Sequence, residues 1–298
     1  MYVSRIERGE RERGLRQVVQ LFSRRQSGSY SARRLRALAR AFEARGAKVL
    51  HCQNGEGTPE IAVEATHVCV AAGDGTVRHV AGAVARAGHP VALSIYPAGT
   101  VNLLAMEAGY PTDPQKFAEL VLEGEPSRPH YPVALGDGYF FACAGVGPDS
   151  FAVAAVSDKL KRRLGRLAYV AAFTSLLRRW PRHRIALEAD GWTVRCEAFY
   201  VAKGRYYAGR WSFARGARVH EPELHVAALT TARRRDYARF VLGLLLGRDS
   251  EHRHGVEVFT CRTLTATSDQ ALPIQADGDI VGTLPAAMAV SEVPLIFC

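Results

Sequence analysis

The chain has 298 residues, of which 48% are hydrophobic and 23% charged, and its formal net charge is +10. This is ordinary globular composition with room for one large or two medium domains, and the uncharged stretches are too short to span a bilayer. Any membrane role must therefore be peripheral. The basic balance suits ATP, an anionic membrane surface or nucleic acid, and an inert basic surface is an equally good explanation.

Six cysteines, at positions 52, 69, 143, 196, 261 and 298, form no Cys-x-x-Cys pair and lie mostly in apolar runs. They are typical of reduced core residues in a cytosolic protein. The charged start of the chain does not resemble a signal peptide. We therefore expect a cytoplasmic protein, with contact at the inner face of the membrane as an open alternative.

The first part of the chain alternates strands and helices. Strands are expected at 17–22, 48–51, 68–72 and 91–96, and helices at 31–45, after residue 76 and at 113–124. The helix at 31–45 shows one apolar stripe, and Asp113 with Pro114 forms a good helix start. This alternation predicts a parallel sheet covered by helices.

Strands dominate after residue 129. They are expected at 139–148, 184–189, 193–200, 224–229, 256–261 and 264–267, with helices at 160–180 and 235–246. Asp190-Gly191 is a good hairpin turn between two of them. We predict an α/β nucleotide-binding domain at 15–128 and a mainly antiparallel β-sandwich domain at 129–298, whose last strands are free to return to the first domain.

The central motif is Gly73-Asp74-Gly75-Thr76, which follows an apolar strand and opens a helix. Glycines let backbone amides approach a phosphate closely, and the start of a helix favours negative charge. A carboxylate beside a phosphate needs a cation, so Asp74 indicates Mg²⁺ or a role in proton transfer. A Gly-Asp-Gly tripeptide without such surroundings is more often a purely structural turn.

The next strand ends in a second turn of the same kind, Pro97-Ala98-Gly99-Thr100-Val101-Asn102. Turns at the carboxyl ends of neighbouring parallel strands line one crevice, where ligands bind in open α/β sheets. The two turns therefore predict one nucleotide site.

Together these turns resemble the signatures of the diacylglycerol kinase catalytic family, which includes bacterial lipid kinases and sphingosine kinases and is distantly related to NAD kinases. The resemblance implies an α/β nucleotide domain followed by a β-sandwich domain, and transfer of a phosphoryl group from ATP to a lipid hydroxyl such as that of diacylglycerol. It assigns nucleotide contacts to Ser27, Gly28, Gly73, Asp74, Gly75, Thr76, Gly99, Thr100 and Asn102.

A late segment, Asp277-Gly278-Asp279, matches the family position of the general base that receives the proton of the lipid hydroxyl. The resemblance thus implies that Asp74, Asp277 and Asp279 are catalytic, with Asp74 near Mg²⁺. It also implies a lipid substrate and an anionic membrane surface as partners, no nucleic acid, and leaves a homodimer open. A basic cluster at 159–166, before the apolar run 167–177, is the expected membrane contact, and a solvated helix face is the alternative.

The chain departs from the family at several acids and amides. Leu103 and Pro132 stand where acids are expected, Ala142 replaces an Asn, and Lys203 opens a segment that normally begins with Asn. A later Asp-Gly pair reads Glu221-Pro222. Two alternatives therefore stay open: a kinase of another alcohol or of NAD, and a nucleotide-binding protein without catalysis.

Overall fold

The computed structural model describes residues 17–24, 31–53, 58–124, 129–155, 175–176, 180, 182–207, 209–247 and 254–298. The chain divides into two compact units, Met1–His130 with Pro294–Cys298, and Tyr131–Val293. The final strand thus belongs to the first unit. The expected fold class, an α/β domain followed by antiparallel β-sheets, is confirmed.

One six-stranded sheet forms the centre of the first unit, in the order β2-β1-β3-β4-β18-β5. Its strands are β1 (Val18–Ser23), β2 (Lys48–Gln53), β3 (His67–Ala72), β4 (Ala92–Pro97), β5 (Pro129–His130) and β18 (Leu295–Phe297). All neighbours pair in parallel except β5, which is antiparallel to β18 at the edge. The strand order reverses between β1 and β3, and ligands bind at such a switch point in open α/β sheets.

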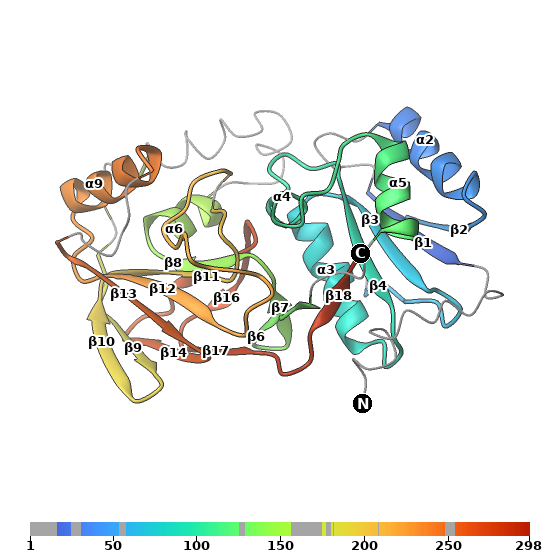
Figure 1. Cartoon of the computed structure of the whole chain (residues 1–298). Helices are drawn as coiled ribbons and strands as arrows, with labels where there is room; N and C mark the ends of the chain where they lie inside the picture. Colours follow the sequence, from blue (N-terminus) through green and yellow to red (C-terminus); the bar gives the residue numbers. More distant parts are fainter. Residues whose placement is uncertain are drawn as a thin grey trace. The chain divides into compact units, whose positions relative to one another are not determined.

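Helices cover both faces of this sheet, α2 and α5 on one and α3 on the other (Figure 1). They are α2 (Ala32–Glu43), α3 (Asp74–Arg86), α4 (Leu103–Glu107) and α5 (Pro114–Glu123). The β3 strand is buried from Val68 to Ala72 because side chains on both of its faces meet helices.

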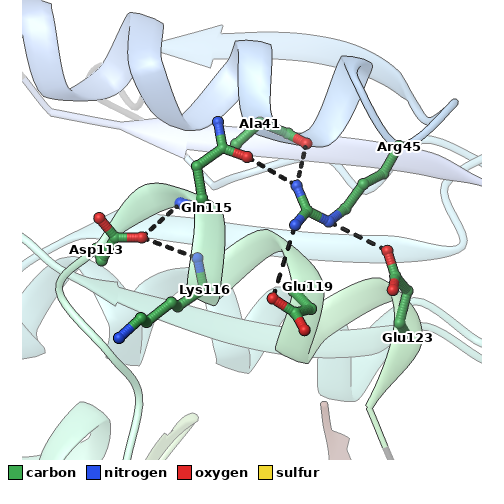
Figure 2. A network of polar contacts seen from close by, with 7 residues as sticks. All are labelled: Ala41, Arg45, Asp113, Gln115, Lys116, Glu119 and Glu123. Atoms are coloured by element: carbon green, nitrogen blue, oxygen red, sulfur yellow. Dashed lines mark hydrogen bonds and ion pairs between the residues drawn. The ribbon is translucent and has the colours of Figure 1, made fainter.

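An arginine network ties α2 to α5 (Figure 2). Arg45 donates to the side chain of Gln115 at 2.8 Å and forms ion pairs with Glu119 at 3.8 Å and Glu123 at 3.1 Å. Asp113 caps α5 as expected, since its carboxylate accepts hydrogen bonds from the backbone amides of Gln115 and Lys116. The contacts hold the two helices side by side over the sheet.

Two six-stranded sheets form the second unit, in the orders β10-β9-β14-β17-β6-β7 and β13-β12-β11-β8-β15-β16. The first sheet contains β6 (Val133–Leu135), β7 (Gly138–Phe140), β9 (Ile185–Ala189), β10 (Trp192–Cys196), β14 (Thr263–Ser268) and β17 (Ala286–Val290). The second contains β8 (Cys143–Val146), β11 (Ala198–Ala202), β12 (Leu224–Leu229), β13 (Val256–Cys261), β15 (Pro273–Ala276) and β16 (Asp279–Thr283). Side chains from both sheets share one core, as in a sandwich.

Two helices accompany these sheets, α6 (Pro148–Ala155) and α9 (Arg234–Leu245). In Figure 1, α9 lies along the outer side of the sheet that contains β11, β12 and β13. Tyr237, Phe240 and Leu244 of α9 form a second core with residues of that sheet.

Two expected strands are each divided in the structure. The strand expected at 139–148 is β7, a break at Phe141–Ala142, and β8 in the other sheet, after which Pro148 begins α6. The strand expected at 193–200 crosses between sheets at Glu197, whose carboxylate accepts from the amide of Ala232 and pairs with Arg182. At each break, a residue far along the chain makes a hydrogen bond or ion pair with the backbone or side chain. The local sequence pattern therefore does not predict where the strand ends.

The hairpin at Asp190-Gly191 is confirmed, and both residues have positive φ, 44° and 87°. The helix expected at 160–180 lies almost wholly outside the described residues, as do the basic cluster at 159–166 and both Ser27 and Gly28. Among the helices in the described ranges, none has the length and apolar character needed to cross a membrane.

Candidate active site

The Gly73 turn joins β3 to α3 in the first unit. Gly73 is the N-cap of the helix, with φ −88° and ψ 171°, and its carbonyl accepts from the amides of Thr76 at 3.0 Å and Val77 at 3.1 Å. Gly73 makes no side-chain cap hydrogen bond, and the amides of Asp74 and Gly75 lie in the first turn, at the positive end of the helix dipole. Such a helix start suits a phosphate.

The Gly99 turn, at the end of β4, lies directly against the Gly73 turn. A Cβ on Gly99 would come within 2.3 Å of the Cα of Gly73 and 2.7 Å of Oδ1 of Asn102. No Cβ approaches other atoms so closely, so only glycine fits at position 99. The structure therefore brings together the two turns for which the sequence predicts one crevice.

Asn102 shapes the Gly99 turn. Its backbone is left-handed, with φ 59° and ψ 53°, and its side-chain Oδ1 accepts from the amide of Gly99 at 2.7 Å while Nδ2 donates to the carbonyl of Gly99 at 3.0 Å. Asn tolerates this backbone better than most residues. Both side-chain polar groups thus contact the turn, which leaves Thr100, exposed at the tip, as the more accessible candidate for nucleotide contact.

The two turns lie beside the switch point of the sheet, at the ends of β3 and β4. The register pairs Ser23 of β1 with Ala71 of β3, and Ala72 of β3 with Pro97 of β4, so the strand ends are level. Arg24, which follows β1, is exposed at the same edge. The fold therefore gathers a helix start, two glycine turns and a cation where an open α/β sheet binds ligands.

Asp74 is the first residue of α3 and is half-buried. In the part of the chain that the structure describes, no three His, Cys, Asp or Glu side chains are grouped to hold a metal ion. One carboxylate beside a phosphate site suits Mg²⁺, which proteins commonly hold through one or two carboxylates plus substrate phosphates. Asp74 is thus the residue of this turn that would hold such an ion.

Asp277 lies in the second unit, in the turn between β15 and β16, and only 3% of it is exposed. Its carboxylate accepts three backbone hydrogen bonds, from Phe141 at 2.8 Å, Ala142 at 2.9 Å and Cys143 at 3.1 Å. These bonds use most of the acceptor positions of a carboxylate and fix its orientation. They also explain why the strand breaks at Phe141–Ala142.

The turn that presents Asp277 is a tight hairpin. Asp277 and Gly278 both have positive φ, 49° and 88°, which is the conformation of a two-residue hairpin loop. Asp279 begins β16 and is half-buried, so it is more accessible than Asp277. The sequence predicts Asp277 as the base; the structure adds that Asp277 also organises the neighbouring backbone.

Both units match known domains in sequence. Residues 18–131 match the diacylglycerol kinase catalytic domain, and residues 142–296 match the YegS C-terminal NAD kinase beta sandwich-like domain. A Pseudomonas aeruginosa protein named "Probable lipid kinase YegS-like" is 33% identical over 215 residues, which are 70% of this chain and 68% of that protein. The chain belongs to the diacylglycerol kinase family. Another relative, the diacylglycerol kinase of Staphylococcus carnosus, is 24% identical over 73% of this chain and 71% of its own length.

Solved structures show the same fold. Two crystal structures of diacylglycerol kinase-type proteins from Bacillus anthracis superimpose with TM-scores of 0.79 and 0.71 and cover 94% of this chain. The matched regions are 94% and 96% of the two solved chains, with sequence identities of 16% and 14%. At this level of identity the likeness concerns the fold of the family alone.

The second unit shows what replaces one of the polar residues usual in the family. Lys203 is fully buried, and its ammonium donates to the carbonyl oxygens of Arg218 at 3.1 Å, Val219 at 2.9 Å and Glu221 at 2.5 Å. A protonated lysine has three N–H donors, so each carbonyl accepts one of them. A positive charge of the chain itself therefore occupies this carbonyl-lined position, and the residues here do not fit a metal ion.

Lys203 and Asp277 meet at the same short segment. The carbonyl of Ala142 accepts from the amides of Lys203 at 2.8 Å and Gly204 at 3.2 Å, while the amide of Ala142 donates to Asp277. Sequence reasoning treated Lys203 only as a departure from the family. A signal was available, because only five of the 39 cationic residues are lysines and this one follows a wholly buried strand.

A buried acid that the sequence analysis did not assign lies at the start of α6. The hydroxyl of Tyr207 donates to the carboxylate of Asp149, and burial raises the pKa of Asp149. Burial also raises the pKa of Tyr207 and Tyr200 well above their usual value. This cluster packs inside the second unit, which indicates a structural role.

Proposed function

We propose that this protein is an ATP-dependent lipid kinase that transfers the γ-phosphoryl group of ATP to a lipid hydroxyl such as that of diacylglycerol. One observation carries the proposal: the backbone contact between Gly73 and Gly99, at the start of α3 and beside the switch point of the sheet. Membership of the diacylglycerol kinase family supports the same reaction class.

The first unit supplies the nucleotide site in this proposal. Amides of residues 73–76 hold phosphate oxygens, and Thr100 contacts the nucleotide from the second turn. Asp74 orients the Mg²⁺ that ATP carries, and the metal supplies charge neutralisation for the phosphates. Ser27 and Gly28, in the loop after β1, complete the predicted contacts.

The second unit supplies the carboxylates. The lipid hydroxyl oxygen forms a bond to the γ-phosphorus, the bond from that phosphorus to the bridging oxygen breaks, and ADP leaves with the electron pair. The hydroxyl proton passes to Asp277, aided by Asp279. Phosphoryl transfer needs little deprotonation early on, so a well-positioned weak base suffices.

The protein acts in the cytoplasm and meets its lipid at an anionic membrane surface in this proposal. The charge of +10 supports such a contact, since exposed cations are attracted to anionic lipid. We infer no nucleic-acid partner. Asp277's three backbone bonds favour one alternative, a nucleotide-binding protein without catalysis, because a carboxylate used to organise backbone can persist without acting as a base.

An acceptor panel tests the proposal. The protein is incubated with γ-labelled ATP and Mg²⁺ together with diacylglycerol, monoacylglycerol, a sphingoid base, NAD or no acceptor. We expect label in a lipid product. Labelled NADP would show the same scaffold used for a soluble acceptor, and ATP binding without any labelled product would establish the non-catalytic alternative.

A further inference from the structure

Helix α9 has a buried face and an exposed face of contrasting character. Tyr237, Phe240 and Leu244 pack against the sheet. The exposed face carries three leucines at Leu242, Leu245 and Leu246, with exposed fractions of 53%, 51% and 55%. Nine large hydrophobic residues are exposed among those described; two of them lie on this helix, and a third, Leu246, is its C-cap.

Cations precede these leucines on the same exposed face. We call the whole set the α9 stripe: Arg234, Arg235, Arg239, Leu242, Leu245 and Leu246. Residues three and four apart on a helix lie on one side, so the stripe runs along a single surface, with arginines in its first half and leucines in its second. In Figure 1, α9 lies at the outer side of its sheet.

An arginine-lined hollow of about 460 Å³ lies at the N-terminal end of α9. Its lining residues are Trp180, Arg182, Arg233, Arg234 and Arg235. Trp180 is fixed in place, because its indole N–H donates to the carbonyl of Ala232 at 2.6 Å and its ring packs edge-on against Tyr237. The hollow is therefore a shallow surface with one fixed aromatic side chain, bordered by arginine residues whose guanidinium groups suit anionic partners.

Five arginines surround the hollow, namely the four that line it and Arg239. Among the described residues, Glu197 pairs with Arg182, and Asp236 lies 3.5 Å from Arg235 and 3.7 Å from Arg239. Arg215, which donates to the carbonyl of Gly247, places another cation at the leucine end.

Cations and exposed leucines on one helix face match one kind of partner better than others. A free phosphate compound would use the arginines but would leave the leucines unexplained. An anionic bilayer uses both, because apolar side chains enter the boundary between headgroups and acyl chains while arginines contact the phosphates.

We propose that the α9 stripe, with the arginine hollow at its N-terminal end, is the surface through which the second unit lies on a bilayer containing anionic phospholipid. The proposal deepens the function argued above, since a lipid kinase must reach a substrate held in a membrane, and it rests on that function. It places the contact on α9 rather than on the basic cluster at 159–166.

Vesicle co-sedimentation without ATP tests this surface. Vesicles of phosphatidylcholine, with and without phosphatidylglycerol, are mixed with the parent, a Leu242→Ser/Leu245→Ser variant and an Arg234→Gln/Arg235→Gln variant. Trp192→Ser and Arg195→Gln are matched controls, because both residues are exposed on β10. We expect the two α9 variants to lose roughly tenfold or more in affinity for anionic vesicles and the controls to match the parent.

Salt separates the two contributions. The parent and the leucine variant should be released by salt, and the arginine variant should respond less. The proposal is overturned if the parent does not bind anionic vesicles, if it binds neutral vesicles equally well, or if both α9 variants bind as the parent does. It is also overturned if sedimentation velocity shows a dimer that the leucine variant splits, because the stripe would then face a second copy.

Kinase assays in detergent micelles distinguish a failure of the membrane-contact proposal from a failure of the proposed kinase function. Neither α9 variant touches the glycine turns or Asp277, so their activity in micelles should equal that of the parent. A parent that binds anionic vesicles but phosphorylates nothing in micelles would contradict the kinase and leave the membrane surface standing.

Discussion

Gly99 and Gly73 touch through their backbones, and the space between them admits no side chain: a Cβ on Gly99 would lie 2.3 Å from the Cα of Gly73. Gly99→Ala therefore must push the two turns apart. We expect the free energy of unfolding to fall by roughly 1–3 kcal/mol and ATP affinity to fall about tenfold or more. Denaturant unfolding and titration calorimetry measure these two effects.

Gly73→Ala is the graded control for this prediction. Its Cβ would meet the Cα of Gly99 at 3.3 Å, a contact that a small backbone adjustment relieves. Its effects on stability and ATP affinity should therefore be smaller. Equal effects of the two variants, or no loss of ATP affinity in Gly99→Ala, would argue against the turns as the phosphate site.

Asn102 offers a second probe of the same turn. Asn102→Ala removes two hydrogen bonds to Gly99 and places alanine in a left-handed backbone conformation, which alanine tolerates poorly. The free energy of unfolding should therefore fall by ~2–4 kcal/mol. Asn102→Gly keeps the backbone conformation and should recover part of the loss. If Ala and Gly prove equally harmful in denaturant titrations, the left-handed backbone is not the cause.

His67 makes the stability of the first unit sensitive to acid. Burial lowers its pKa from 6.5 to about 4, so between these values the unfolded chain binds a proton that the folded chain does not. Stability should therefore be fully present above pH 6.5 and fall as the pH drops toward 4, by at most ~3 kcal/mol. His67→Gln should flatten this part of the profile, measured by denaturant unfolding at several pH values.

The difference between parent and variant isolates His67, because burial also lowers the pKa of His225 in the second unit and carboxylates titrate in the same range. A profile for His67→Gln that runs parallel to the parent's between pH 4 and 6.5 would show that this histidine is not the source.

Lys203 should stabilise the second unit without any metal ion. Lys203→Met removes a buried ammonium and leaves three carbonyl oxygens without their donor, so stability should fall by about 3–5 kcal/mol. Lys48→Met is the control, because Lys48 is exposed. A chelator should leave the melting temperature of the ligand-free parent unchanged, and a marked drop on chelation would mean that a metal, not Lys203, holds this loop.

Local patterns predicted most elements of the first unit, but not β5 or β18. Ser31 and Asp113 cap α2 and α5 with their side chains, and the apolar run at 68–72 leads directly into the Gly73 turn. These signals lie within a few residues of the structure they determine. The sequence therefore predicts both glycine turns, whereas their direct contact is seen only in the structure.

The breaks in the second unit depend on contacts between distant residues. The carboxylate of Asp277 reaches amides 134 to 136 residues earlier, and Lys203 reaches carbonyls 15 to 18 residues later. An alternating pattern of apolar and polar residues does not predict which backbone groups will form hydrogen bonds with a side chain far along the chain. For the same reason the sequence did not predict the arginine hollow, since its arginines come from two separate segments of the chain.

Transfer of label from γ-labelled ATP to diacylglycerol in mixed micelles tests the central claim most directly, with Asp277→Asn and Asp279→Asn beside the parent. We predict labelled phosphatidic acid from the parent and a ~10²–10⁴-fold lower rate for Asp277→Asn, with a smaller loss for Asp279→Asn and nearly constant ATP affinity in both. Circular dichroism must show Asp277→Asn folded, because its carboxylate also holds three amides. A parent that binds ATP and labels no lipid, or an Asp277→Asn variant as fast as the parent, would contradict the account.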